Sequence, residues 1–294
     1  MRGAYIRMNL AIFLWGFTGL LGKKILLNEG MLVWYRMLIS ALCIFLILFF
    51  RRSLPRLSPK KWLQISGIGV LVMLHWLTFY GSIKASSISV AMICLSSIAM
   101  FASILEPLAN KQRFDYVEIF FSALAIVGIS SIYFSDVNAS IGVILGVISS
   151  LLSAIFSILN RKIASDHEPL TISFIELSAG WLMLTLLLPL YFSFKPTDKF
   201  IPDFTDSIYL LILAIVCTVL TWILSLQALQ KVSAYTMALA LNLEPIYGII
   251  LAVLYAEEAK FINGWFIAGS LIILFTVICH TWYKFRKSKK AILI

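Results

Sequence analysis

A glutamate and a proline stand side by side in an apolar stretch, LNLEPIYGIILAVLYAEE, that covers residues 241–258. In a bilayer, a carboxyl group such as that of Glu244 is costly unless it meets water, a partner or a proton. Pro245 lacks a backbone N–H, so it leaves a helical carbonyl without its usual partner. We therefore predict that this stretch lines a polar cavity and bends there, with Pro245 as a hinge. The alternative is a neutral glutamate bonded to a neighbouring helix.

Helical spacing indicates which residues accompany this carboxyl group. Tyr247, three residues after Glu244, shares its face and is the next candidate for ligand binding. Asn242 lies about 200° around the helix from Glu244 and is a weaker candidate. Glu244 could itself carry a coupling proton.

Further candidates lie in two other apolar stretches. LHWLTFYGS contains His75 and Tyr80, and LTWILSLQ contains Trp222. A buried histidine is either a hydrogen-bonded packing group or a ligand-binding group, and both interpretations stay open. Trp15 and Asn160, in two other stretches, are weaker candidates for a cavity wall.

Two opposite charges fall within apolar stretches at similar places in the two halves of the chain. They are Arg36 and Glu176. We interpret them as a structural salt bridge or as groups that extend to the membrane surface, and gating is the alternative.

The composition shows which elements must position these residues. The chain has 294 residues, 61% hydrophobic and 13% charged, with a mean hydropathy of +0.96, whereas a soluble chain carries about 25% charged residues. Stretches long enough to cross a bilayer recur throughout. We predict an all-α polytopic membrane protein with ten transmembrane helices, at residues 8–28, 30–50, 62–83, 87–108, 116–134, 140–160, 170–193, 206–229, 233–256 and 263–284.

The basic residues indicate the orientation in the membrane. With a cytoplasmic N-terminus, 17 of the 24 Lys and Arg residues fall in cytoplasmic segments and 6 in outer ones, while Arg36 lies within a helix. Such a bias predicts that both termini face the cytoplasm of a multi-pass protein in the cytoplasmic (inner) membrane. It also explains the net charge of +10 without a nucleic-acid partner.

An internal repeat predicts the architecture. GSIKASSISVAMICLSS (81–97) resembles ALQKVSAYTMALALNLE (228–244) at a shift of 147 residues. We expect a first repeat at residues 1–137, a second at 138–294, and five helices in each. An odd number of helices inverts the second copy, as in many secondary transporters.

Three parts of the sequence carry a family likeness. They are NLAIFLWGFTGLLGKKIL with YRMLISAL, LLSAIFSILNRKIA with SFIELSAGWLML, and the segment from ALQKVSAYTMALALNLEPIYG to INGWFIAGSLIIL. The chain resembles EamA-type members of the drug/metabolite transporter superfamily over nearly its whole length. The resemblance implies ten helices in two inverted repeats, cytoplasmic termini and transport of small metabolites, often amino acids. The family usually has a proline and a glutamate in the first repeat also, where this chain has Ser97 and Asn110.

We therefore expect a secondary transporter that moves a small organic metabolite, most simply outward, as a monomer or dimer in the lipid bilayer, either coupled to a proton or as a facilitator. A membrane protein without transport activity and an intramembrane enzyme are the alternatives. An enzyme would need a nucleophile with a base, or metal ligands, but the three histidines are scattered and GxSxG and HExxH motifs are absent. The four cysteines form no CxxC pair, so we expect no metal and no cofactor.

Overall fold

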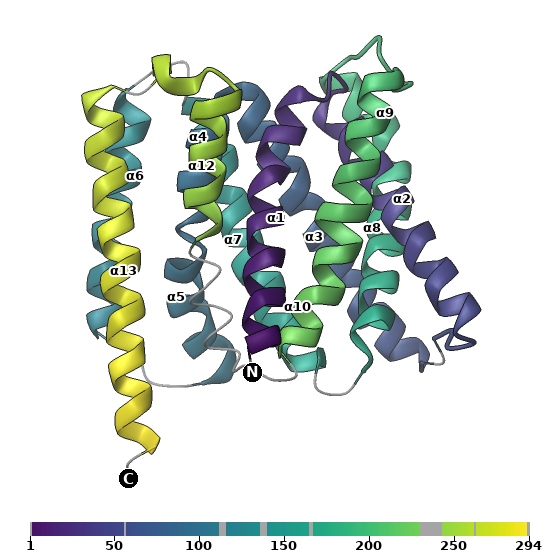
Figure 1. Ribbon diagram of the computed structural model, residues 1–294, viewed down its shortest axis with the longest axis horizontal. Coiled ribbons are helices and arrows are strands. Elements are labelled where there is room, and N and C mark those ends of the chain that lie inside the picture. Colours follow the sequence, from purple (N-terminus) through teal and green to yellow (C-terminus); the bar gives the residue numbers. More distant parts are fainter. Residues whose placement is uncertain are drawn as a thin grey trace.

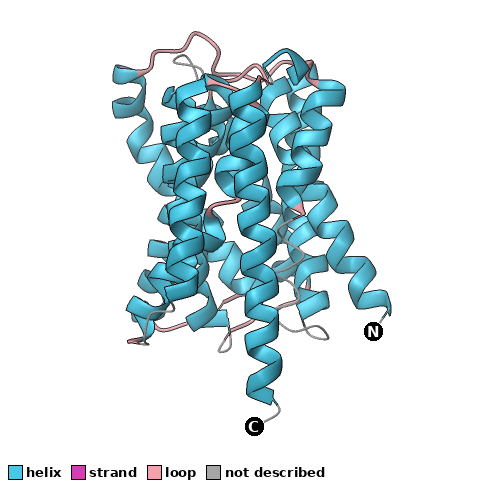
Figure 2. Ribbon diagram, turned by 90° about the vertical axis from the view of Figure 1, so that its left-hand side faces the viewer, coloured by secondary structure: helices cyan, strands magenta, loops and turns pink. Residues whose placement is uncertain are grey.

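The computed structural model describes residues 2–55, 57–111, 116–135, 140–164, 167–229, 243–261 and 263–292. All regular elements in these ranges are helical, and the long helices run roughly side by side (Figures 1 and 2). They are α1 (Arg2–Lys24), α2 (Glu29–Phe50), α3 (Pro59–Ala85), α4 (Ile88–Leu95), α5 (Ile98–Asn110), α6 (Tyr116–Ser135), α7 (Ser140–Ala164), α8 (Pro169–Phe194), α9 (Phe204–Leu211), a π-helix η2 (Ile212–Leu220), α10 (Thr221–Leu229), α12 (Glu244–Tyr255), a 3-10 helix η3 (Glu258–Phe261) and α13 (Gly264–Ile292).

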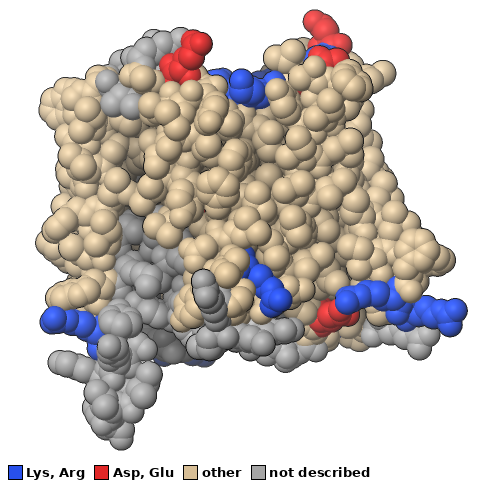
Figure 3. Space-filling model, viewed as in Figure 1, with Lys and Arg blue, Asp and Glu red and all other residues tan. Residues whose placement is uncertain are grey.

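The surface is that of a membrane protein. Lys, Arg, Asp and Glu gather at the two ends of the bundle, and the face between them is almost free of charge (Figure 3). Among the described residues, seven helices are long and apolar enough to cross a bilayer, and Glu244–Tyr255 and Gly264–Thr276 are shorter apolar helices. The prediction of a polytopic, all-helical membrane protein is confirmed, whereas the count of ten helices stays a prediction.

Local sequence signals start several of these helices. Asn28 and Ser87 accept hydrogen bonds from the backbone N–H groups of Met31 and Val90, which caps α2 and α4. Pro59 begins α3 and Pro169 begins α8, at positions where a missing N–H costs nothing.

The core forms where α3 packs against α7 and α8, while α2 covers α8 and α13 pairs with α6. Small residues bring these helices close together. A Cβ on Gly69 of α3 would lie 2.2 Å from the carbonyl oxygen of Glu176 in α8, so only glycine fits there. Such close backbone approach is how helices associate in lipid, where the hydrophobic effect between them is weak.

The predicted helix 87–108 is interrupted in the structure. Helix α4 ends at Leu95 and α5 begins at Ile98, with a turn at Ser96 and Ser97 between them. The carbonyl of Cys94 accepts hydrogen bonds from the Ser97 N–H (3.0 Å), the Ser97 hydroxyl (2.6 Å) and the Ser150 hydroxyl of α7 (2.6 Å). Side chains thus satisfy backbone groups that a break in a membrane would leave unpaired. Serines thus stand at the interruption in the first half of the chain.

Candidate functional site

A buried guanidinium marks the centre of the candidate site. Arg36 of α2 is only 4% exposed. Its Nη1 donates to the Tyr80 hydroxyl of α3 at 2.7 Å, and its Nε donates to Thr218 Oγ1 of η2 at 3.0 Å. Its Cζ lies 3.7 Å from the centre of the Trp76 ring, a cation–π contact. We call these four residues the Arg36 cluster.

The π-helix positions one member of this cluster. Thr218 donates to the carbonyl of Leu213, five residues earlier, at 2.9 Å, while it accepts from Arg36. A π-helix of nine residues is unusual, and such segments concentrate at functional sites. The sequence analysis missed Thr218 because hydrophobic periodicity does not distinguish a π-turn from an α-turn. It also missed Trp76, although a spacing of four from Tyr80 places both on one face of α3.

Glu244 is the acidic group that faces this cluster. It is half-buried, and the charges of Arg36 and Glu244 act on each other. No nitrogen–oxygen contact of 4.0 Å or less joins the two, so they do not form a direct ion pair. Among the described residues, neither the Arg36 guanidinium nor the Glu244 carboxyl group has a directly bonded group of opposite charge.

The position of Pro245 differs from the prediction. Helix α12 begins at Glu244, so the proline stands in its first turn and not in the middle of a described helix. Its missing N–H removes no helical hydrogen bond there, and the fixed φ of proline suits a helix start. The first bond of the helix runs from Tyr247 N to Leu243 O at 3.0 Å.

Tyr247 of α12 and Trp15 of α1 pack against the same buried residues. Both contact a small apolar group around Met8 and Ile12, and the Tyr247 ring lies edge-on to Phe13 at 5.6 Å. An open groove of about 580 Å³ runs along this side, lined by Tyr5, Ile6, Asn9, Leu10, Phe13 and Tyr247. The expectation that Glu244 and Tyr247 line one wall stays a prediction, and the ring contact of Tyr247 is with Phe13 of α1.

His75 is bonded within the core. Its Nδ1 lies 2.9 Å from the carbonyl oxygen and 2.8 Å from the hydroxyl of Ser149 in α7, and Phe79 stacks on its ring. These contacts fit the packing interpretation. Trp222 is half-buried in α10, and Asn242 lies outside the described residues.

Glu176 and Asn160 lie together instead of the expected pair with Arg36. The Asn160 side chain hydrogen-bonds to the Glu176 carboxyl group. Because Arg36 is held by Tyr80 and Thr218, the salt bridge between Arg36 and Glu176 is not present. The salt-bridge interpretation is therefore wrong, because similar places in the two halves need not be neighbours in space, whereas the gating alternative stays a prediction.

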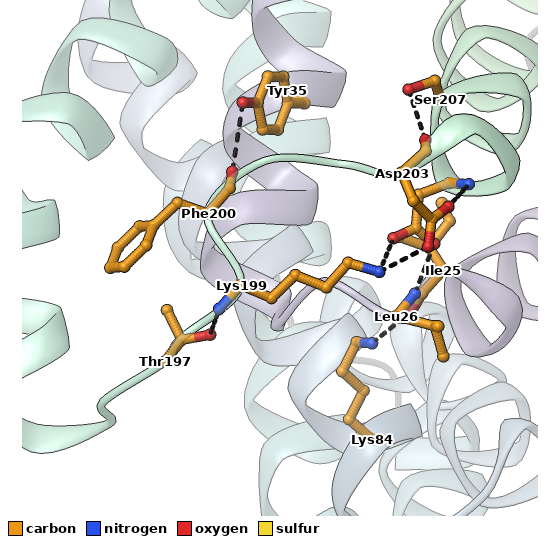
Figure 4. A network of polar contacts seen from close by, with 10 residues as sticks. Ile25, Leu26, Tyr35, Lys84, Thr197, Lys199, Phe200, Asp203 and Ser207 are labelled. Carbon is orange, nitrogen blue, oxygen red and sulfur yellow. Dashed lines mark hydrogen bonds and ion pairs between the residues drawn. The ribbon is translucent and has the colours of Figure 1, made fainter.

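A polar network closes the end of the bundle opposite the described chain ends (Figures 1 and 4). Lys199 pairs with Asp203 at 2.8 Å and with Asp206 at 2.7 Å, and Asp206 accepts from the N–H of Leu26 at 2.8 Å. Lys84 donates to the carbonyl of Ile25 at 2.8 Å. The segment between α1 and α2 is thereby tied to α3 and α9.

Two groups of this network lie outside the membrane spans. The N–H of Asp206 and then the Lys199 ammonium hold the pKa of Asp203 below its ordinary value of 3.8. The carboxylates of Asp203 and Asp206 raise the pKa of Lys199 above 10.5. Both groups are therefore charged at neutral pH.

Comparison with known proteins agrees with this architecture. The profile described as "EamA-like transporter family" matches residues 3–134 and, a second time, residues 140–282. An "Uncharacterized transporter" from Archaeoglobus fulgidus is 24% identical over 237 residues, which are 78% of this chain and 80% of that protein. One solved structure, titled only "Crystal structure of protein", superposes with a TM-score of 0.63 at 12% identity over 93% of this chain and 95% of that one, and so shows the fold alone.

Proposed function

Because the chain belongs to the EamA-like transporter family, of the drug/metabolite transporter superfamily, we propose that it exports a small organic metabolite, an amino acid or a related compound, by alternating access. The family and the transporter from Archaeoglobus fulgidus favour a membrane transporter over an enzyme. Substrate, direction and mechanism are our proposal, and the following contacts support them.

The single observation that carries the substrate class is the pair of opposed charges, Arg36 and Glu244, without a direct ion pair between them. An amino acid carries one carboxylate and one ammonium group. The planar guanidinium of arginine matches a carboxylate, and Glu244 would receive the ammonium group. The rings of Trp76 and Tyr80, next to the guanidinium, would contact the apolar part of the substrate.

Two helix ends support alternating access. Helix α4 ends before the turn at Ser96–Ser97, and α12 starts at Glu244, which follows Ser97 by the 147 residues of the sequence repeat. The twofold match of the family profile fits two repeats. Transporters built from inverted repeats often bind substrate where interrupted helices meet. We propose that residues 1–137 and 138–294 rock against each other around the Arg36 cluster.

We also propose that both termini face the cytoplasm, in the inner membrane. The described ends of α1 and α13 lie at the same end of the bundle (Figure 1). The bias of basic residues predicts that this end faces the cytoplasm. A C-terminal reporter that is active only in the periplasm would contradict this orientation.

The test of function uses purified protein in liposomes loaded with single amino acids, each compared with its decarboxylated amine and its deaminated acid. We expect efflux of at least one intact amino acid and weak or no efflux of both analogues. Arg36→Gln should weaken apparent affinity for the amino acid by about 10–100-fold, the loss of one charged contact, and Glu244→Gln should do the same.

Exposed residues with the same side chains serve as controls. Arg51→Gln and Glu257→Gln should behave like the wild type, since both side chains are exposed. If no amino acid crosses, or if Arg36→Gln and Glu244→Gln transport like the wild type, the proposal is wrong. Recovery of a chemically altered compound would instead indicate the enzyme alternative.

A further inference from the structure

A second polar site lies between α7 and α8. Glu176 is 1% exposed, and its carboxyl group receives a hydrogen bond from the Asn160 amide. The carboxyl oxygen Glu176 Oε1 and the amide oxygen Asn160 Oδ1 are both buried and have no hydrogen-bond partner. These two unpaired atoms belong to the same pair of side chains, and both are acceptors.

We propose that Glu176 and Asn160 form a proton-binding pair, and that the proton it holds is the one coupled to transport. One proton completes the hydrogen bonding of both groups. When it binds to the carboxylate, one carboxyl oxygen becomes an O–H donor that reaches the Asn160 Oδ1, while the amide N–H still donates to the other oxygen. No other bond forms or breaks.

The charged groups around Glu176 are bonded to other residues. Helices α2 and α3 pack against α8, and their buried charged or titratable groups all have partners: Glu29, bonded to Tyr191 and Lys195; Arg36 and Tyr80, bonded to each other; and His75, bonded to Ser149. On α7, Lys162 donates to the carbonyl of Ala109. Glu176 forms no ion pair with a described side chain and its Oε1 has no hydrogen-bond partner, so a proton is the simplest partner for that oxygen.

The packing around the pair suggests how the proton would be gated. Gly69 allows α3 to lie directly on the Glu176 backbone. A Cβ added to Gly180 of α8 would lie 2.7 Å from the Gly69 carbonyl oxygen, so the two helices also approach closely there. In this closed arrangement Glu176 has no contact with water. A movement that separates α8 from α7 would break the acid–amide pair and expose the carboxyl group, which then releases its proton. This coupling step rests on the proposed transport function, whereas the binding of the proton does not.

Infrared difference spectroscopy on protein in lipid tests the proton site without any substrate. We expect the spectrum at neutral pH to contain a carbonyl band of a protonated carboxyl group. Glu176→Gln should remove it, and Asn160→Leu should shift it because the hydrogen bonds to the amide are lost. Glu168→Gln, at an exposed glutamate that starts the same helix and pairs with Arg51, should leave the band unchanged. An unchanged band in Glu176→Gln would overturn the proposal.

Glu176→Gln should fold, because its amide NH₂ can donate to the Asn160 Oδ1 as the protonated acid would. In liposomes with a pH-sensitive dye inside, wild-type transport should move protons with substrate. Glu176→Gln should abolish this proton movement but keep exchange of substrate against substrate.

The coupling would be overturned if Glu176→Gln moved protons at the wild-type rate. It would also be overturned if the wild type transported substrate without moving protons. If no substrate crosses in any variant while the infrared band still depends on Glu176, the proposed function fails but the proton site stands.

Discussion

At the scale of single residues, the buried charges differ in how they are accommodated. Arg36 is satisfied by two hydroxyl groups and one ring face, none of which neutralises its charge. Among the described residues it forms no ion pair, with Glu244 or with any other carboxylate. A buried charge without a bonded counter-ion is costly. A site of this kind is therefore typical of a residue that gains its partner from a ligand.

Thr218 should contribute more to the free energy of unfolding than an ordinary buried threonine. Thr218→Val removes the acceptor for Arg36 Nε, and an unsatisfied charged donor costs about 1–3 kcal/mol. We expect a loss of that size in the free energy of unfolding, measured by denaturant titration in micelles. Thr276→Val is the control, because Thr276 is equally buried but bonds only to its own helix, at Ile272 O. Equal losses for both variants would show that the contact with Arg36 contributes nothing.

At the scale of elements, the helix ends inside the protein have specific partners. Helix α4 starts at a buried position, where Glu258 accepts from the N–H of Ile88 at 2.7 Å and from the N–H and hydroxyl of Ser89 at 2.9 and 2.7 Å. A carboxylate at a helix N-terminus also complements the helix dipole. The segment after α12 thereby holds the start of α4 in place.

Loss of this cap should destabilise the protein. Glu258→Ala leaves three buried donors without an acceptor, and we expect a loss of about 1–3 kcal/mol or more in the free energy of unfolding. Glu257→Ala removes the neighbouring, exposed carboxylate and should change stability by less than about 0.5 kcal/mol. Denaturant titration of both variants decides the matter, and a stable Glu258→Ala would mean that water can replace the cap.

Pro245→Ala gives the second test of a helix end. A proline in the first turn restricts the unfolded chain and costs no hydrogen bond, so its replacement should lower stability by about 0.4–1 kcal/mol. A proline in the middle of a helix would give the opposite sign, because alanine would restore a missing bond. Comparison of the unfolding free energies of the wild type and the variant separates the two cases.

At the scale of the whole molecule, one end of the bundle is closed by ion pairs (Figure 4). The network joins the segment between α1 and α2 to α9, and therefore joins the two halves of the chain. If the halves rock as proposed, these contacts must break in each cycle. Their strength would then influence the rate of transport as well as stability.

The pKa shifts in this network fix the pH range in which it holds. The pKa of Asp203 is lowered, so its contribution is present above pH 3.8 and is lost as the pH falls through the folded value. The pKa of Lys199 is raised, so its contribution is complete below pH 10.5 and is lost as the pH rises through the folded value.

Lys199→Met should therefore lower the thermal midpoint at about pH 7, and this effect should shrink at a second pH below 3.8, as the pH falls through the folded pKa of Asp203. Because these groups are exposed at a surface, the effect should be small. Lys24→Met, at an exposed lysine at the end of α1, is the control. A difference between wild type and Lys199→Met that is the same at both pH values would exclude an electrostatic contribution from Lys199.

The sequence by itself determined the environment of the chain, a lipid bilayer, and the class of fold. Apolar stretches of bilayer length and clustered basic loops predict a polytopic helical protein, because the bilayer requires each crossing segment to satisfy its own backbone. Long helices such as Glu29–Phe50 and Pro169–Phe194 lie within a residue or two of their predicted bounds. These predictions rest on residues that are close together in the sequence. The likeness to EamA-type proteins also came from consecutive residues.

Only the tertiary structure decided which polar groups meet. Arg36 pairs with Tyr80 and Thr218, which follow it by 44 and 182 residues, and Glu176 meets Asn160 instead of Arg36. The interruption at Ser96–Ser97 depends on a hydroxyl from α7, and the π-helix becomes useful only because Arg36 faces it. Helical periodicity gives the face on which a residue lies, but the neighbour of that face is set by how whole helices pack. That packing depends on contacts far apart in the sequence, so no local pattern contains it.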